Sequence, residues 1–491
     1  MLRISEQKYI SDYLTKYSCD LKRTWDLVNG IINKKKKYSK LPNIINATSG
    51  CVIDDSKAIA DYFNEYFTNI GPTLGNKMKC IGLNPIDNMG AKTPASMFLT
   101  PVHNNELLDA FNQLKNTSAG YDDIKPIVLQ SLKVELLHPV LHLVNLSFKQ
   151  GIFPDSLKIA CISPIHKQGQ VNFVENYRPV SVLCSLSKIF ERIMCNRLLN
   201  FIDSFNILYK NQYGFRKGYS TDLALLKLND DILRALDEKK KVVGVYMDLA
   251  KAFDTINHEI LIQKLDHYGV RGRALSWFKS YLSNRYQMVK YHNVLSEKSK
   301  IICGVPQGSI IGPVLFLLYI NDIHRVSEKL SFVMFADDTN IFIKGCDLNN
   351  IISILNSELK NISTWFQANQ LSLNVSKTHY MIFSNCRAKA HSTVNIDGHE
   401  LEMVSCTKFL GVKIDDKLTW KEHISYVKHK LMKSLGILYK IRNVLTRKWR
   451  IKLYKTFVLP HLNYCNIVWA STYQSSLKDL FIVQKKALNW L

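Results

Sequence analysis

The sequence predicts an α+β fold in which a small antiparallel sheet is backed by helices. Three observations support this prediction. Short β-rich runs alternate with longer stretches whose apolar residues recur at helical spacing. Between residues 242 and 383 the expected order is strand, helix, helix, hairpin, helix and strand, which suits antiparallel strands covered by helices on one face. The length of 491 residues, 46% of them hydrophobic, allows about three structural units with a sizeable core.

Residues 1–95 are expected to form helical segments separated by turns. Apolar residues are helix-spaced between Trp25 and Ile32, and proline and glycine interrupt the chain that follows. The four consecutive lysines Lys34–Lys37 fit a solvated basic turn, a nuclear targeting signal or an RNA contact. From residue 96 to about 235 the pattern is mainly helical, with a short extended piece at Ile159–Ile165.

The next stretch is the most regular part of the sequence. Its strands are short and β-rich, and its helices show apolar residues at a period of 3.6. The expected elements are, in order, a strand at Val242–Met247, a helix from Thr255 to about Tyr281, the loop GVPQGS at 304–309, a helix at Ile310–Ile323, a hairpin at Ser331–Ile343, a helix at Asn349–Gln370 and a strand at Tyr380–Phe383. From residue 391 a short sheet-like piece at Phe409–Ile414 precedes helices rich in Lys and Arg, which we expect to form a separate basic unit.

The charge of the chain indicates a polyanionic partner. There are 65 Lys and Arg against 41 Asp and Glu, a formal net charge of +24. On a folded body such an excess favours nucleic acid or an acidic membrane surface. The apolar run Pro313–Ile320 is far shorter than the roughly 20 residues that cross a bilayer, so we expect no membrane segment.

The cysteines and the N-terminus indicate an intracellular protein. None of the 11 cysteines lies in a C-x-x-C pair, which argues against a disulfide scaffold and a zinc knuckle. The first residues lack the apolar core and cleavage site of a secretory signal. We therefore expect the protein in the nucleus, the cytoplasm or both.

Three carboxylates are the strongest candidates for chemistry. Asp337 and Asp338 lie between two strand-like runs, where adjacent like charges are costly unless a bound cation neutralises them. Asp248 ends another strand and could meet this pair across the sheet. Three such carboxylates would suit Mg²⁺, and two ions roughly 3.5–4 Å apart would suit phosphoryl transfer. The sequence thus indicates nucleotidyl transfer.

Eight segments in the expected order resemble the motifs of reverse transcriptases of non-LTR retrotransposons, in particular the jockey-like branch. In the catalytic half these are VVGVYMDLAKAFDTINHEIL, GVPQGSIIGPVLF, FADD and LSLNVSKTHYMIF. Upstream, ISPIHKQGQVNFVENYRPVSVL and NQYGFRKGYST resemble fingers motifs, and downstream FLGVKID resembles the primer grip. The segment LPHLNYCNIVWA resembles the region beyond the thumb in jockey-like elements.

The resemblance implies a right-hand polymerase. Residues 1–95 would be an N-terminal helical or linker region, and residues 96–390 the fingers and palm, with core motifs at 158–385. Residues 391–491 would hold the primer grip, the thumb and a truncated C-terminal helical region. Relatives usually carry an endonuclease ahead of the polymerase, and residues 1–100 show no such segment. We therefore expect the chain to be part of a longer reading frame, without an RNase H domain or a Cys/His knuckle.

The same resemblance implies roles for the acidic motif residues. Asp248, Asp337 and Asp338 would hold two Mg²⁺ ions, with Mn²⁺ as a substitute. Phe253 would be the steric gate that excludes a 2′-hydroxyl, against the simpler interpretation of an ordinary core phenylalanine. Asp254 is expected to cap a helix rather than to bind metal.

Further roles concern the incoming nucleotide. Gln307 and Gly308 would belong to a loop that contacts it, with glycine allowing close backbone approach; a tight turn without a ligand is the alternative. Lys167 and Arg178 would grip the triphosphate. Lys377 would protonate the departing pyrophosphate, because a lysine amine is charged at neutral pH; a solvated surface lysine is the alternative.

The resemblance implies an RNA-directed DNA polymerase that extends a primer 3′-OH on an RNA template. Its partners would be template RNA, a DNA primer or target, deoxynucleoside triphosphates and, in a ribonucleoprotein, the element RNA. Two alternatives remain: a truncated, inactive element copy, and a maturase-like RNA-binding cofactor that retains the fold. A viral RNA polymerase is disfavoured because Ala336, and not glycine, precedes the aspartate pair.

Overall fold

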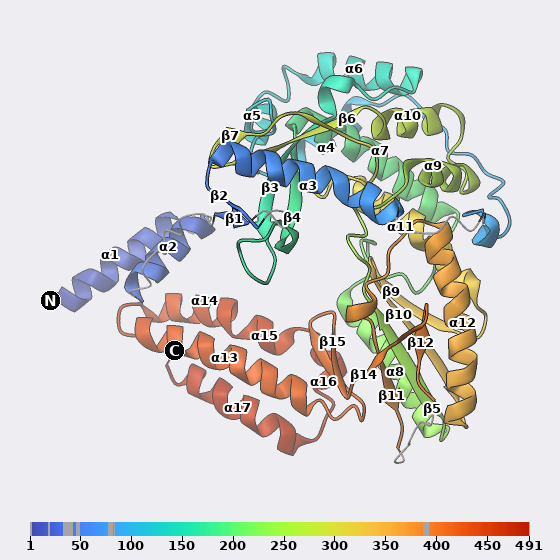
Figure 1. Cartoon of the computed structure of the whole chain (residues 1–491). Helices are drawn as coiled ribbons and strands as arrows, with labels where there is room; N and C mark the ends of the chain where they lie inside the picture. Colours follow the sequence, from blue (N-terminus) through green and yellow to red (C-terminus); the bar gives the residue numbers. More distant parts are fainter. Residues whose placement is uncertain are drawn as a thin grey trace.

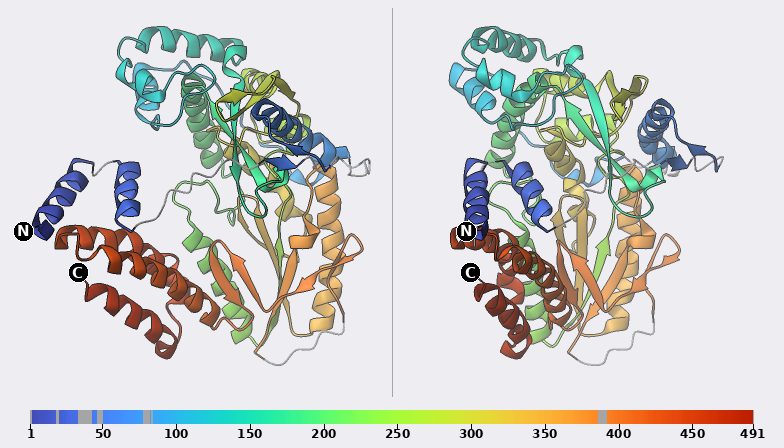
Figure 2. Two further views of the ribbon diagram at one scale, coloured as in Figure 1. Left: turned by 60° about the vertical axis from the view of Figure 1, so that its left-hand side comes forward. Right: turned by 90° about the vertical axis from the view of Figure 1, so that its left-hand side faces the viewer.

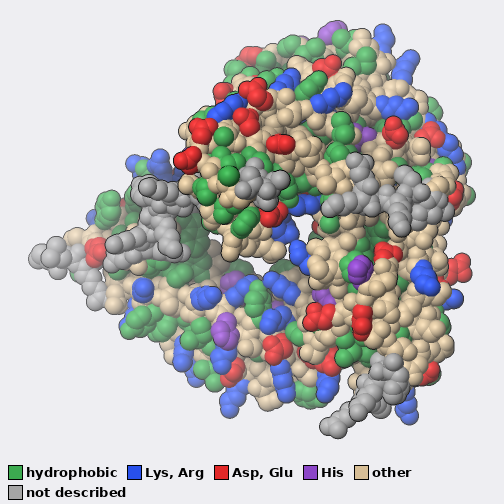
Figure 3. Space-filling model, viewed as in Figure 1, with side chains coloured by type: hydrophobic (Ala, Val, Ile, Leu, Met, Phe, Trp, Pro, Cys, Tyr) green, Lys and Arg blue, Asp and Glu red, His purple; other side chains and the backbone are tan. Residues whose placement is uncertain are grey.

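The structure is a computed structural model that describes residues 2–17, 20–32, 43–45, 50–76, 82, 84–385 and 392–490. The basic run Lys34–Lys37 lies outside these residues. The described chain surrounds a central hollow, with the palm sheet on one side, the fingers above it and the thumb helices opposite (Figures 1 and 3). This arrangement is the α+β, right-hand form that the sequence predicts.

The palm is built on a five-stranded sheet of order β14-β11-β5-β10-β9. All neighbours are antiparallel except β11 and β14. The strands are β5 (Lys241–Met247), β9 (Ser331–Phe335), β10 (Asp338–Gly345), β11 (His379–Phe383) and β14 (Glu402–Met403). Because β10 pairs Thr339 with Met247 and β11 pairs His379 with Tyr246, the residues before β10 and β11 meet the residue after β5 at one end of the sheet. The site lies at that end.

Helices cover both faces of the palm sheet. On one face Val243 and Val245 pack with α9 (His258–His267), α11 (Gly312–Ile320) and α12 (Leu348–Ala368). On the other face Val242 and Tyr246 pack with α8 (Thr221–Asp237) and the thumb helix α13 (Lys421–Ile441). The expectation of helices on one face was therefore wrong. The reason is visible in VVGVYM, which is apolar without alternation, as in strands buried on both sides.

The expected helix from Thr255 to about Tyr281 is two helices. The structure has α9 and α10 (Gly272–Leu282), separated by a turn. Gly269 in that turn has φ +100°, and a Cβ there would lie 2.4 Å from the Ala95 carbonyl oxygen. Glycine ends the first helix because another residue would meet both backbone strain and this contact.

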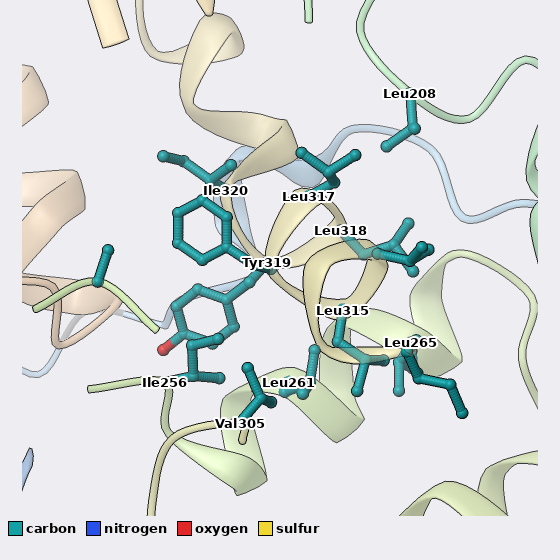
Figure 4. Close-up of a cluster of buried hydrophobic side chains, with 14 of the residues drawn as sticks. Leu208, Ile256, Leu261, Leu265, Val305, Leu315, Leu317, Leu318, Tyr319 and Ile320 are labelled. Carbon is teal, nitrogen blue, oxygen red and sulfur yellow. The ribbon is translucent and has the colours of Figure 1, made fainter. Parts of the chain in front are cut away.

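Helix α11 forms the centre of the palm core. It is apolar all round, and Leu315, Leu318 and Ile320 are completely buried (Figure 4). The Tyr319 hydroxyl, also buried, donates to the Asn369 carbonyl at 2.6 Å. The short helix η4 (Asn321–Val326) follows directly and ends the apolar segment that the sequence predicts.

A buried ion pair joins the helices behind the palm. Lys264 of α9 lies 2.5 Å from the carboxylate of Asp322, and both side chains are almost fully buried. Lys264 also donates to the Tyr319 carbonyl at 2.7 Å, and the Trp365 indole donates to the other Asp322 oxygen at 2.8 Å. The Asp322 carboxylate thus has two donors and the Lys264 ammonium has two acceptors, as buried charges require.

The fingers contain a second sheet of order β4-β3-β6-β7, with β8 paired to β6. Strand β3 matches the extended piece expected from the sequence, and α3 packs on this sheet. The elements are α3 (Ser56–Asn76), η1 (Asp87–Met89), α4 (Asn104–Asn112), α5 (Pro126–Ser131), α6 (Leu137–Gln150), η2 (Asp155–Leu157), β3 (Ile159–His166), η3 (Val174–Asn176), β4 (Tyr177–Leu183), α7 (Ser185–Ser204), β6 (Arg285–Tyr291), β7 (Val294–Leu295) and β8 (Ser299–Ile301).

The thumb follows the palm and begins with a hairpin. Its apolar core continues into the α8 face of the palm sheet. The short elements η5 (Val375–Lys377), β12 (Asn395–Ile396) and β13 (His399–Glu400) lie between α12 and the palm strand β14 in the sequence. The elements that follow β14 are β15 (Cys406–Phe409), β16 (Val412–Asp415), α13, α14 (Arg447–Phe457), α15 (Leu459–Asn463), α16 (Asn466–Trp469) and α17 (Gln474–Leu488).

The N-terminal elements divide between thumb and fingers. Helices α1 (Leu2–Lys16) and α2 (Leu21–Ile31) lie beside the thumb helices in every view (Figures 1 and 2). The Trp449 indole donates to the Ser11 hydroxyl at 3.2 Å, and the Trp25 and Phe457 rings are 5.0 Å apart. Strands β1 (Ile44–Ile45) and β2 (Val52–Ile53) precede α3, and the Ile45 amide donates to the Asn172 carbonyl of the fingers.

No helix among the described residues is long and apolar enough to cross a membrane. The cysteines that the structure describes are free thiols.

Candidate active site

A cavity of about 510 Å³ opens at the end of the palm sheet where the three motif strands meet. Seven of the nine predicted site residues line it: Lys167, Arg178, Asp248, Phe253, Gln307, Asp337 and Lys377. Asp338 and Gly308 are the two that do not line this cavity. The cavity therefore gathers residues from the fingers hairpin β3–β4, the strand β5, the loop 304–309 and the hairpin β9–β10.

The turn between β9 and β10 presents Asp337 and Asp338. Ala336 at this turn has φ +56°, a left-handed conformation that costs about 1 kcal/mol for a residue other than glycine. The turn is held from a different segment, because Gln212 accepts hydrogen bonds from the amides of Ala336 and Gly214 at 3.0 and 2.9 Å. A Cβ at Gly214 would lie 2.3 Å from the Ala336 nitrogen. The segment NQYG thus fixes the turn that carries both carboxylates.

Asp248 is held by the turn that precedes β11. The Asn374 side chain donates to its Oδ2 at 3.1 Å, and the Asn374 amide donates to its carbonyl at 2.8 Å. The Lys377 ammonium lies 3.8 Å from the same Oδ2. Asp248 and Lys377 are both about half exposed, so this ion pair is weak.

The three carboxylates influence one another. Burial raises the pKa of Asp337, and the Asp248 carboxylate adds to the rise, while Lys167 and Arg178 oppose it. Lost hydration together with the charges of Asp337 and Asp248 raises the pKa of Asp338 to about 6. Such mutual repulsion is what a bound cation relieves.

The carboxylates do not form a ready-made coordination sphere. In the part of the chain that the structure describes, no group of three or more His, Cys, Asp or Glu side chains could hold a metal ion together. Their chemistry nevertheless fits a hard divalent cation, because all three offer carboxylate oxygens and two have a raised pKa in its absence. The predicted triad is thus brought to one place, but its oxygens are not yet arranged around one point.

Phe253 combines the two roles that the sequence left open. Its ring stacks on Phe316 with centroids 4.7 Å apart and meets Phe215 edge-on at 6.4 Å. The same side chain lines the cavity. It is therefore packed against the palm core on one side and faces the cavity on the other.

The loop 304–309 bears on two expectations. Gly308 has φ +139°, and a Cβ there would lie 2.3 Å from the Ser181 carbonyl oxygen, so glycine lets strand β4 approach, and a contact of Gly308 with the nucleotide stays a prediction. Asp254 does not cap α9, because Asn257 is the N-cap and accepts from the amides of Glu259 and Ile260. The Asp254 carboxylate instead accepts from the Gln307 amide nitrogen, with both oxygens at 2.8 Å.

Basic residues line the same cavity as the carboxylates. Lys167 follows β3, and Arg178 in β4 pairs with Ile165, so the hairpin brings both cations to the cavity. Burial lowers the pKa of Lys167, and the charges of Arg178 and Lys377 lower it further. The crowding of these positive charges favours an anionic ligand.

Three further residues of the site were given no role by the sequence analysis. Lys251 lines the cavity, and its ammonium contacts the carbonyls of Glu175 and Tyr177 at 3.4 and 3.3 Å. Asn374 holds Asp248, and Gln212 holds the aspartate turn. All three lie inside or beside quoted motifs, so their positions were available, but their roles depend on contacts between distant segments.

Comparison with known proteins identifies the part of the chain that contains this site. Residues 165–414, half of the chain, match the family described as reverse transcriptase (RNA-dependent DNA polymerase). All nine predicted site residues lie within this match, and so does the whole lining of the cavity.

Several fruit-fly proteins are similar over most of the chain. The probable RNA-directed DNA polymerase from transposon BS of Drosophila melanogaster is 28% identical over 82% of this chain and 46% of its own length. The probable RNA-directed DNA polymerase from transposon X-element of the same species is 26% identical over 82% of this chain and 45% of its own length. The RNA-directed DNA polymerase from mobile element jockey of Drosophila melanogaster is 31% identical over 69% of this chain and 38% of its own length. The chain thus spans less than half the length of these relatives.

Proposed function

The chain belongs to the reverse transcriptase (RNA-dependent DNA polymerase) family, and from this premise we propose that it is the RNA-directed DNA polymerase of a non-LTR retrotransposon. It would add deoxynucleotides to a primer 3′-OH on an RNA template. The observation that carries the proposal is the cavity in which Asp248 and Asp337 face Lys167, Arg178, Lys251 and Lys377. A nucleoside triphosphate with divalent cations needs both kinds of charge.

We propose that Asp248, Asp337 and Asp338 hold two Mg²⁺ ions, with Mn²⁺ as a substitute. When bound, such a pair supplies activation of the attacking hydroxyl and stabilisation of the leaving oxygen. The Lys377 ammonium lies 3.8 Å from Asp248 Oδ2, so a bound cation would compete with this weak contact.

The other residues bind and orient the substrate in this proposal. Lys167 and Arg178 hold the triphosphate, for which the planar fork of arginine and the point charge of lysine are both suited. Lys377 gives a proton to the departing pyrophosphate. Phe253 excludes a 2′-hydroxyl, because its ring is fixed by the stack on Phe316 and cannot easily move away.

The nucleic acid partners are proposed from the charge of the thumb. Lys408, Lys413 and Lys430 surround the Tyr426 ring at 5.4, 5.9 and 4.5 Å, and Lys430 and then Lys408 lower the pKa of its hydroxyl. Lys413 also pairs with Glu422 at 3.5 Å, and a cluster of three lysines around one ring suits a backbone phosphate. Figure 3 shows basic side chains along the thumb edge that faces the hollow. We propose that template RNA and primer DNA lie there, in a ribonucleoprotein with the element RNA.

The alternatives of an inactive element copy and a maturase-like cofactor are not favoured. The carboxylates and cations of the site are all present, and the relatives above carry polymerase names. No feature of the described residues specifically favours either alternative.

The test is Mg²⁺-dependent extension of a DNA primer on a heteropolymeric RNA template. The parent is compared with the double variant Asp337→Asn, Asp338→Asn and with Asp266→Asn as a matched control. Asp266 lies on α9 outside the cavity and pairs with Lys92 at 2.5 Å. We expect extension by the parent and the control, and loss of at least about a thousandfold in the double variant, since the site loses its charge for the metal.

Two outcomes would contradict the proposal. One is a parent that is folded and binds RNA but does not extend the primer. The other is extension by a double variant that equals the parent. Cooperative urea unfolding of all three proteins serves as the control for folding.

A further inference from the structure

The side chain of Gln307 is anchored by a carboxylate that lies outside the active-site cavity. Its amide nitrogen is 2.8 Å from both oxygens of Asp254. Gln307 lines both the 510 Å³ cavity and a smaller cavity of about 40 Å³, whereas Asp254 lines the smaller one. Asp254 therefore acts on the substrate cavity through neighbouring side chains, and Gln307 is the one that it holds by hydrogen bonds.

The backbone around this contact forms one rigid unit. The Val305 amide donates to the Phe253 carbonyl at 2.9 Å, and the Gly304 amide donates to the Ile256 carbonyl at 2.8 Å. A Cβ at Gly304 would lie 2.8–3.0 Å from backbone atoms of Asp254, so the loop and the turn are in direct contact. On its other side the loop is held by β4, because the Ser181 amide donates to the Gln307 carbonyl at 2.8 Å. The backbone thus has little freedom, and the Gln307 side chain remains the part to be oriented.

The anchor decides which end of the Gln307 amide faces the cavity. A carboxylate accepts hydrogen bonds and does not donate, so the amide nitrogen, and not the oxygen, must face Asp254. The carbonyl oxygen of the amide then points away from Asp254. An amide without this anchor could present either end, because its two ends differ little in shape.

We propose that Asp254 is a positioning residue that fixes Gln307 with its amide oxygen presented to the incoming nucleotide as a hydrogen-bond acceptor. The inference rests on the proposed polymerase function and adds a residue to it. Charge-assisted hydrogen bonds are stronger than neutral ones, which explains why a carboxylate rather than an amide serves as the anchor. Asp254 is also adjacent to Phe253, so a single turn sets both the cavity wall and the orientation of Gln307.

The test is a cycle of four proteins: the parent, Asp254→Ala, Gln307→Ala and the double variant. Single-nucleotide extension gives kcat and KM for the deoxynucleotide in each protein. We expect Asp254→Ala to raise KM about tenfold with little change in kcat, because a contact made in the ground state is weakened. In a protein that already carries Gln307→Ala, Asp254→Ala should cause no further rise in KM, because the side chain that Asp254 positions is absent.

Two additional variants complete the design. Asp254→Asn keeps one acceptor oxygen for Gln307 and should raise KM less than Asp254→Ala does. Asp266→Asn, on α9 and outside both cavities, should leave KM unchanged. Additive losses in the cycle, or equal effects of Asp254→Asn and Asp254→Ala, would overturn the proposal. So would a changed Mg²⁺ requirement in Asp254→Ala, because it would make Asp254 a metal ligand.

The same four proteins distinguish failure of the anchor from failure of the polymerase function. Urea unfolding measures the coupling of Asp254 and Gln307 without any catalysis, and we expect a coupling of about tenfold in the unfolding equilibrium constant. If unfolding shows the coupling of Asp254 and Gln307 but the parent does not extend the primer, the proposed polymerase function is refuted and the contact between the two residues still stands. Extension by the parent without coupling in either measurement would refute the role of Asp254.

Discussion

Replacing Asp338 by Asn should stabilise the metal-free protein at neutral pH and have little effect at pH 4. Lost hydration and the charges of Asp337 and Asp248 raise the pKa of Asp338 to about 6, against an ordinary value of 3.8. Between these two pH values the folded protein binds more protons at this carboxyl than the unfolded chain does. Stability therefore falls as the pH rises through this interval, and the charged form remains unfavourable above pH 6.

The size of the effect follows from the shift and from the exposure of the side chain. A displacement of about two pH units corresponds to about 3 kcal/mol if it acts fully. Asp338 is exposed, so solvent screens its interactions, and we expect about 1 kcal/mol at pH 7.5. Asparagine has nearly the same shape and no charge, so the variant should lack this penalty.

The assay is urea unfolding of parent and Asp338→Asn at pH 4, 5, 6 and 7.5 in EDTA. The difference in unfolding free energy between the two proteins should be near zero at pH 4 and should grow towards neutral pH. Added Mg²⁺ should reverse the order, because only the parent retains the full set of carboxylates. A difference that is constant with pH, or a variant that is less stable at pH 7.5, would refute the electrostatic reasoning.

Three further predictions concern the core, the gate and the thumb. Lys264→Met should destabilise the protein by about 3–5 kcal/mol in urea unfolding, because the Asp322 carboxylate would remain buried without its partner. Adding Asp322→Leu should recover most of this loss, and no recovery would contradict the ion-pair explanation. Phe253→Val should increase ribonucleotide incorporation relative to deoxynucleotide incorporation at least about tenfold in single-turnover assays, since it removes the ring from the cavity wall; unchanged discrimination would exclude the gate role. Lys408→Met and Lys430→Met should each lower the slope of log affinity against log salt for a primer–template by about one, and an unchanged slope would place the phosphate contacts elsewhere.

The sequence was sufficient for the parts of the site that lie within single motifs. The strand before Asp248 and the hairpin that carries Asp337 were predicted and are confirmed, because an apolar run that ends at a polar residue is a local signal. The resemblance also led us to expect Lys167 and Arg178 together at the active site. Their placement follows from one hairpin, β3–β4.

What the sequence did not reveal depends on contacts between distant segments. Gln212 reaches the Ala336 turn, 124 residues away, and no periodicity reports such a contact. Asp254 has the sequence pattern of a helix cap, but in the structure its carboxylate accepts a hydrogen bond from the distant Gln307 side chain. Gly269 lies within the single helix expected from Thr255 to about Tyr281, and the contact of its backbone with the Ala95 carbonyl is not a local signal. Local patterns thus predict elements, and tertiary neighbours decide what single polar or small residues do.

The N-terminal elements attach to both the thumb and the fingers, and this limits how far these two parts can separate. Helix α2 ends at Ile31 on the thumb, and β1 begins at Ile44 against the fingers. Thirteen peptide steps can span at most about 45 Å when fully extended. Any separation of the two attachment points beyond that distance requires α1 and α2 to leave the thumb, or β1 to leave the fingers. The two attachments therefore limit how far the thumb and the fingers can separate while both contacts are kept.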